Sequence, residues 1–285
     1  MKKINMLNDY VFKKVMGEKG DEDQLKGFLE AVLGRILEEV EIIGEKELTA
    51  EIVGDKLSIL DVRAKTDDNT EVNIEVQLRN EYNIDRRSLF YWSRLYGKSL
   101  EESERYKNLP NIITINILKF NYFKVNTAAK KYHSVYRLYE EETKQKLTDA
   151  LEIHFLEMRK FMKLKEKDTA NNRIHRWLTF LNESTNEEVV KEMANMDKAI
   201  SQAKKKYDYV LSDKETLHYA QLRERAIIGY NSDIADAEER GEKKGEKKVA
   251  INLINMGLSN AQISEATDYL LSEEDIEKLR IQQNR

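Results

Sequence analysis

The first third of the chain alternates between segments with helical and with strand-like hydrophobic spacing. Apolar residues in segment 25–37 recur with the period of a helix, whereas in segment 71–79 they occupy every second position. Segment 57–65 has the same alternation, and the turn-forming residues 67–69 separate it from 71–79. The pattern therefore predicts a β-hairpin at this place.

Beyond the hairpin, the pattern predicts a helix over 85–103 and further strands at 111–118, 132–139 and 151–158. Charged segments with helical spacing follow. We therefore expect an α/β domain at 1–160, a helical region at 161–235, and a charged linker with a small helical tail at 236–285.

The C-terminal part carries a charge run with two glycines, 238–248, which indicates a hinge or the solvated start of a helix. The short helices predicted after it are compatible with a helix-turn-helix DNA-binding motif. The alternative is a helical tail that forms a homo-oligomer or packs on the first domain. We favour the tail because the last segment is acidic, which is unfavourable for contact with DNA.

Three side chains with acceptor oxygens lie on the predicted hairpin: Asp61, Glu75 and Gln77. Glu75 and Gln77 share one face of their strand because they are two residues apart. Asp61 faces Glu75 only if the intervening turn has an odd number of residues or the hairpin contains a bulge; a two-residue turn would direct Glu75 to the other side. The odd turn is thus a condition for a shared site.

Two carboxylates held close together repel each other unless a cation lies between them. Oxygen ligands without His or Cys favour a hard ion, so the expected ion is Mg²⁺, with Mn²⁺ as the substitute, and the main-chain carbonyl of Val76 is a further candidate ligand. The alternative is that Asp61 and Glu75 are solvated residues on an exposed strand face.

Basic and aromatic residues form one stripe on the helix predicted after the hairpin: Arg87, Tyr91, Arg94 and Lys98. The residues expected on much of the other side of that helix are Leu89, Trp92, Leu95 and Tyr96. Such a stripe beside a carboxylate site is suited to contact a DNA phosphate backbone. A merely solvated helix face is the alternative.

The composition, with 40% hydrophobic and 35% charged residues, is typical of a soluble protein. The absence of cysteine excludes disulfides and thiol catalysis, and the lack of a long apolar stretch or an apolar segment near the N-terminus predicts a cytoplasmic protein without membrane contact. The net charge of −4 argues against a large nucleic-acid surface, though not against a local basic groove.

Five ordered blocks resemble the Rpn family of recombination-promoting nucleases, which are transposase-like members of the PD-(D/E)XK nuclease superfamily: 8–17, 57–80, 86–100, 111–120 and 151–155. The resemblance implies a restriction-endonuclease-like core, a mixed β-sheet flanked by helices, and Mg²⁺-dependent hydrolysis of phosphodiester bonds in DNA. It also implies that Asp61 is the first aspartate of the motif and Glu75 its second acidic residue.

Gln77 stands where the superfamily usually has lysine, and a glutamine can orient water but cannot supply positive charge. Arg87 or Lys65 are candidates to replace that charge. Asp9 is a candidate to support the metal site, with Lys13 one helical turn further on, although Asp9 is also suited to cap its helix.

We therefore expect a DNA endonuclease of low sequence specificity, linked to recombination or mobile elements. The alternative is a non-catalytic DNA-binding or interaction protein that retains the nuclease fold.

Overall fold

Two compact units, residues 1–227 and 228–285, make up the chain. The computed structural model describes residues 4–43, 61–80, 83–100, 105–124 and 130–283. The described elements of the first unit up to the last strand are α1 (Asp9–Met16), α2 (Glu22–Leu33), β1 (Val40–Ile42), β2 (Val62–Thr66), β3 (Thr70–Gln77), α4 (Ile84–Lys98), the 3₁₀ helix η1 (Tyr106–Asn108), β4 (Asn111–Leu118), β5 (His133–Arg137) and β6 (Leu151–Glu157). They are followed by α5 (Met158–Met162), α6 (Arg173–Leu181), α7 (Glu187–Met196), α8 (Lys198–Ser212), α9 (Lys214–Asn255), α10 (Asn260–Ala266) and α11 (Glu273–Gln283).

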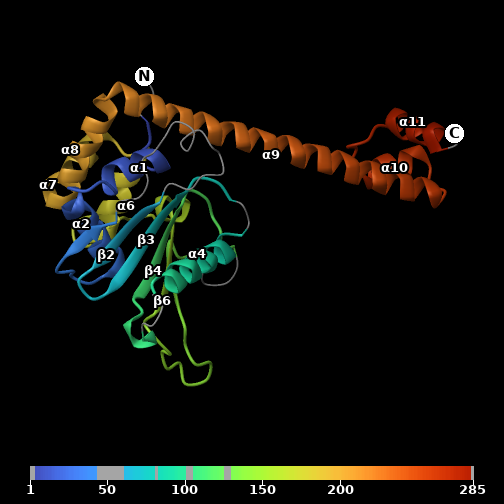
Figure 1. Ribbon diagram of the computed structural model, residues 1–285. Helices are drawn as coiled ribbons and strands as arrows, with labels where there is room; N and C mark the ends of the chain where they lie inside the picture. The colour runs from blue at the N-terminus through green and yellow to red at the C-terminus, as the bar shows by residue number, and fades with distance from the viewer. Residues whose placement is uncertain (1–3, 44–60, 81–82, 101–104, 125–129, 284–285) are drawn as a thin grey trace. The chain divides into compact units, whose positions relative to one another are not determined.

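The six described strands form one mixed sheet in the order β1-β2-β3-β4-β6-β5. β1, β2 and β3 are antiparallel, β3, β4 and β6 are parallel, and β5 pairs antiparallel with β6. The crossover from β3 to β4 carries α4, which lies on one face of the sheet, whereas α1 and α2 lie on the other (Figure 1). The α/β fold with a mixed sheet flanked by helices is therefore confirmed, as are the three strands expected after α4.

The predicted elements differ from the observed ones mainly at their ends. The first predicted helix ends at Leu33 rather than residue 37, because Gly34 adopts a left-handed conformation with φ 67°. Of the predicted strand 57–65, residues 57–60 lie outside the described part of the chain, and regular pairing begins at Val62, so Asp61 immediately precedes β2. Leu89, expected to lie on the packed side of its helix, is 48% exposed.

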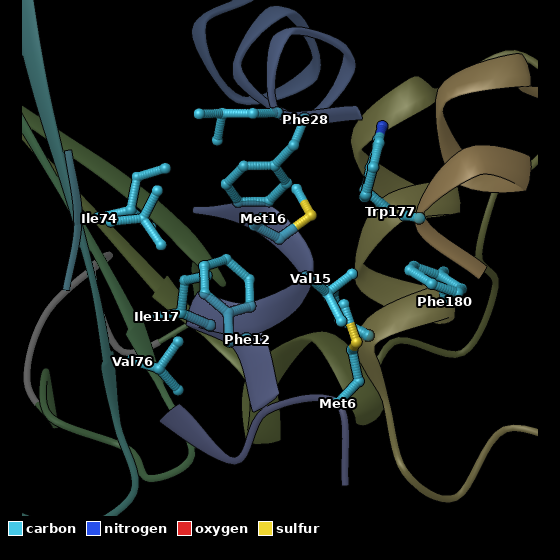
Figure 2. Close-up of a cluster of buried hydrophobic side chains, with 14 of the residues drawn as sticks. Met6, Phe12, Val15, Met16, Phe28, Ile74, Val76, Ile117, Trp177 and Phe180 are labelled. Atoms are coloured by element: carbon cyan, nitrogen blue, oxygen red, sulfur yellow. The ribbon is translucent and has the colours of Figure 1, made fainter. Parts of the chain in front are cut away.

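The main core lies between the sheet and the helices α1, α2 and α6 (Figure 2). The Phe28 ring packs edge-on against Phe12 and Trp177, with ring centres 6.2 and 5.5 Å apart. Trp177 of α6 is fully buried. The side chains that line this core from β3 and β4 are the alternate apolar ones, including Ile74 and Ile117.

The predicted boundary near residue 160 does not separate two bodies, because the helices that follow it join the main core. Gly27 makes this possible in the middle of α2, since a Cβ atom there would overlap the Cβ of Ala199 on α8. Arg173 of α6 bridges Glu30 of α2 and Asp197 at the start of α8, at 2.6 Å to each. The division of the chain instead falls within α9.

Segment 238–248 lies inside the continuous helix α9 and is largely exposed. Of the two alternatives, the hinge is therefore wrong, and the segment is a solvated part of a helix that begins earlier, at Lys214. Alternating Lys and Glu favour the helix through pairs such as Lys243 with Glu239, whose atoms lie 2.6 Å apart. After α9, a capping box formed by Ser259 and Gln262 begins α10. None of the described helices has the length and apolar character needed to span a membrane.

Candidate active site

The turn between β2 and β3 decides which residues face each other across the hairpin. It has three residues, 67–69, and Asn69 adopts a left-handed conformation with φ 55°, as in three-residue hairpin loops that close with a bulge. The register pairs Val62 with Ile74. Extended by one residue along both chains, this register would bring Asp61, which immediately precedes β2, opposite Glu75. The odd-numbered turn that the sequence required is therefore confirmed.

Glu75 lies beneath α4 with only 2% of its surface exposed. The alternative of a solvated carboxylate on an open strand face is therefore wrong for Glu75. The guanidinium group of Arg87, on the first turn of α4, donates a hydrogen bond to the Glu75 carboxylate. This pairing offsets part of the cost of burying the negative charge.

Two hydrogen bonds fix α4 on the sheet and thereby position Arg87. The Ser88 hydroxyl donates to Oδ1 of Asn116 on β4 at 3.0 Å. Nε1 of Trp92 donates to the carbonyl of Ala150 at 2.9 Å, just before β6. Because one bond joins α4 to β4 and the other to the residue just before β6, Arg87 is supported by a helix held against the sheet rather than by a loop.

A pocket of about 190 Å³ opens beside Asp61, lined by Asp61, Arg63, Asn73, Tyr91, Arg94, Leu95 and Lys98. Three of the four stripe residues predicted on α4 therefore line the same pocket as Asp61. The fourth, Arg87, pairs with Glu75. The predicted carboxylates and the predicted stripe thus meet on one face of the sheet.

Tyr91 connects the pocket to the buried ion pair. The Cζ atom of Arg87 lies 5.8 Å from the centre of the Tyr91 ring. Burial is the main cause that raises the pKa of the Tyr91 hydroxyl, and the positive charge of Arg87 opposes it. The carboxylates of Glu75 and Asp61 both raise this pKa further. Both carboxylates are therefore near enough to act on one hydroxyl group.

The oxygen donors on this face suit a hard divalent cation. Besides the two carboxylates, Asn73 lines the pocket, is 3% exposed, and has an Oδ1 atom without a hydrogen-bond partner among the described residues. A buried oxygen of this kind costs free energy unless a ligand takes up the position. Alternation along β3 predicts that Asn73 lies on the face of Glu75, but no sequence pattern distinguishes this neutral amide as a functional residue.

The carboxylate donors are few. Within the described part of the chain, no three His, Asp or Glu side chains are grouped as metal ligands. Mg²⁺ typically uses one or two carboxylates and retains several waters. Two carboxylates with neutral oxygen donors nearby are therefore compatible with this ion.

Gln77 and Val76 occupy the end of β3. Gln77 is 6% exposed and pairs in register with Leu118 of β4, and alternation places its side chain on the face of Glu75. The Val76 side chain lies in the main core on the opposite face.

Lys65 is not brought to the site. It is exposed and lies opposite Glu71 at the turn end of β2. Four residues of extended strand separate it from Asp61, which is roughly 13 Å. Its positive charge is therefore remote from the pocket.

Asp9 is buried in a different set of contacts. Its carboxylate accepts hydrogen bonds from Arg223 of α9, at 2.8 Å from Nε. The cap of α1 is Asn8, whose side chain accepts from the N–H of Val11, so the cap expected at Asp9 is wrong. Lys13 is half-buried on the same helix.

Similarity to known proteins agrees with this geometry. A family model described as PD-(D/E)XK nuclease family transposase matches residues 6–237. No curated protein and no solved structure matches the chain. The matched region includes the sheet, α4 and helices α6 to α8. With the resemblance confirmed over most of its length, the chain belongs to the PD-(D/E)XK nuclease family transposases.

Proposed function

We propose that the protein is a Mg²⁺-dependent DNA endonuclease that hydrolyses phosphodiester bonds with low sequence specificity. The observation that supports the proposal is the hairpin register, which pairs Val62 with Ile74. The adjoining positions, Asp61 and Glu75, would then face each other beneath α4. The family description supports a nuclease or transposase-like role in general, and a link to recombination or mobile elements is part of the proposal.

Asp61 and Glu75 would hold the ion, and the carbonyl of Val76 is a further candidate ligand. When bound, Mg²⁺ promotes ionisation of water and neutralises charge that develops on the phosphate. The Asn73 Oδ1 atom is available to orient a water at the pocket wall. The carboxylates then supply the negative site that retains a cation beside the phosphate.

Gln77 and Arg87 divide the tasks that the usual motif lysine performs. The Gln77 amide can accept and donate hydrogen bonds and so can position water. It carries no charge, whereas the Arg87 guanidinium is permanently charged and already lies against Glu75. Arg87 is therefore the better candidate to stabilise negative charge on the phosphate.

Low specificity follows from the kind of side chains around the pocket. The exposed cations Arg94 and Lys98 carry charge that suits phosphate oxygens. Contacts with phosphates position DNA but carry no information about base sequence. Binding through these residues would therefore tolerate many sequences.

Plasmid nicking in the presence of Mg²⁺ tests the proposal. The wild-type chain should nick supercoiled plasmid, and Asp61→Ala and Glu75→Ala should reduce the rate by at least about 100-fold because each removes a ligand charge. Glu71→Ala is a matched control, since it removes a carboxylate from the same face of β3. Equal nicking by all four proteins would refute the assignment.

A second function is a DNA-binding protein that retains the fold without turnover. Two observations favour it: a glutamine stands in the position of the motif lysine, and Arg87 already occupies the Glu75 carboxylate. Gel-shift binding without any Mg²⁺-dependent cleavage would support this second function over the first.

A further inference from the structure

Phe90 is an exposed aromatic residue beside the candidate site. It lies on α4 with 56% of its surface exposed, and α4 packs on the sheet with Ile84 and Ser88 buried. Phe90 is three residues after Arg87 and four before Arg94, so it shares their side of the helix. Packing does not explain a large apolar side chain in this position.

A row of contacts between arginines and aromatic rings leads from the buried ion pair outward to Phe90. Arg87 contacts the Tyr91 ring, with 5.8 Å from Cζ to its centre. The Tyr91 and Phe90 ring centres lie 5.7 Å apart, with an interplanar angle of 60°. The Cζ atom of Arg94 lies 5.8 Å from the centre of the Phe90 ring. The array therefore connects Glu75 with the solvent-exposed surface of α4.

The charges around Phe90 indicate the chemistry of its partner. Arg86, Phe90 and Arg94 follow one another at intervals of four residues, so a cation flanks the ring on each side along the helix. Both arginines are exposed, as is Lys98 one turn further on. A partner that satisfies this surface must combine negative charge with flat apolar faces.

We propose that Phe90, flanked by Arg86 and Arg94, stacks against an unpaired base of the DNA strand, and that the substrate therefore has single-stranded character. This inference rests on the proposed nuclease function and specifies its substrate class. In a duplex each base face is covered by its neighbours, so an exposed ring gains a stacking partner only when a base is unpaired or at a junction. Aromatic stacking combined with cations is the usual means of binding single strands without reading sequence.

The test is binding of the full-length protein to a fluorescent oligothymidylate and to a matched duplex, measured by anisotropy in EDTA so that cleavage cannot occur. Phe90→Ala should weaken binding to the single strand by about tenfold and leave duplex binding nearly unchanged. Phe90→Trp should retain binding because it retains a stacking face. Phe90→Leu should behave like Phe90→Ala, since it keeps an apolar side chain without a ring.

Leu89→Ala provides a matched control on the same helix. Leu89 is 48% exposed but does not belong to the stripe of residues spaced four apart that contains Arg86, Phe90 and Arg94. Its removal should therefore leave single-strand binding unchanged. An equal loss with Leu89→Ala and Phe90→Ala, or equal losses for single strand and duplex, would overturn the stacking role.

Two further outcomes distinguish a failure of the stacking role from a failure of the proposed nuclease function. If Phe90→Ala changes only the oligomeric state seen by light scattering and not DNA binding, Phe90 serves a protein contact and the inference is wrong. If Phe90 variants alter single-strand binding but plasmid nicking does not depend on Asp61, the stacking role stands and the proposed nuclease function fails.

Discussion

The two faces of β3 and β4 are buried to the same degree but differ in chemistry. Toward α1 and α2, the central residues Ile74 and Ile115 are fully buried in the main core. Toward α4, the neighbouring Glu75 and Asn116 are 2% and 1% exposed. Central strands covered on both faces are usually apolar throughout. The α4 face therefore contributes less hydrophobic stabilisation than the opposite face does. Buried polar side chains at positions where apolar ones would be more stable are expected of a functional surface.

The polar face is also only partly satisfied by its own hydrogen bonds. Asn116 accepts from Ser88 and donates to the carbonyl of His154. Asn73 Oδ1 and Thr114 Oγ1, by contrast, have no hydrogen-bond partner among the described residues. Because unpartnered buried oxygens are destabilising, this face is not optimised for stability alone.

The largest expected effect is on the apolar face. Ile115→Ala should lower the free energy of unfolding by about 3–4 kcal/mol, because it removes fully buried apolar volume. Cleavage per folded molecule should not change. Urea unfolding followed by tryptophan fluorescence, with nicking assayed on the same sample, measures both. A stability loss below about 1 kcal/mol would mean that the two faces do not differ as described.

Arg87→Ala should destabilise the protein by about 2–3 kcal/mol, because it leaves the buried Glu75 carboxylate without this cation. Adding Glu75→Gln should recover most of that loss, since the uncompensated charge is then removed. Arg94→Ala, which removes an exposed cation from the same helix, is the control and should be nearly neutral. A double variant no more stable than Arg87→Ala would contradict this account of the pair.

A histidine pair is the polar exception on the apolar face. His133 Nε2 lies 2.9 Å from His154 Nδ1, at the edge formed by β5 and β6. Burial, and then the neighbouring His154, lowers the pKa of His133 to about 4. The unfolded chain, with a pKa of about 6.5 for this group, takes up a proton at higher pH than the folded chain does.

The contribution of His133 to stability should therefore be complete above about pH 6.5 and fall as the pH approaches 4. His133→Asn should remove about 2 kcal/mol of this acid-induced loss. The free energy of unfolding of wild type and variant, measured across this pH range, tests this role. Nicking at neutral pH is the control and should not change if His133 serves stability alone. An identical pH dependence in the variant would contradict it.

The smallest effect is expected on the polar face. Thr114→Val should leave stability unchanged or raise it by up to about 1 kcal/mol, because it replaces an unpartnered hydroxyl with a methyl group. Ser88→Ala is the matched comparison and should cost about 1 kcal/mol, since its hydroxyl donates to Asn116. A clear loss with Thr114→Val would show that this hydroxyl has a stabilising partner.

The sequence predicted the hairpin and the odd turn because alternation and turn chemistry are local. Alternation also placed Glu75 correctly but could not show that α4 covers it. The packing of Gly27 against Ala199 joins residues 172 positions apart in the chain, so no local pattern indicated that α8 belongs to the first domain. The pairing of His133 with His154 likewise depends on strand order, which the sequence pattern left open.

The most direct test of the central claim, that the polar face serves cleavage rather than stability, is Asp61→Asn. This change retains the shape of a half-buried side chain and removes only its charge. Mg²⁺-dependent nicking per folded molecule should fall by at least about 100-fold, while the free energy of unfolding stays within about 1 kcal/mol of the wild-type value. Undiminished nicking, or a loss of nicking that only follows a loss of folded protein, would contradict the claim.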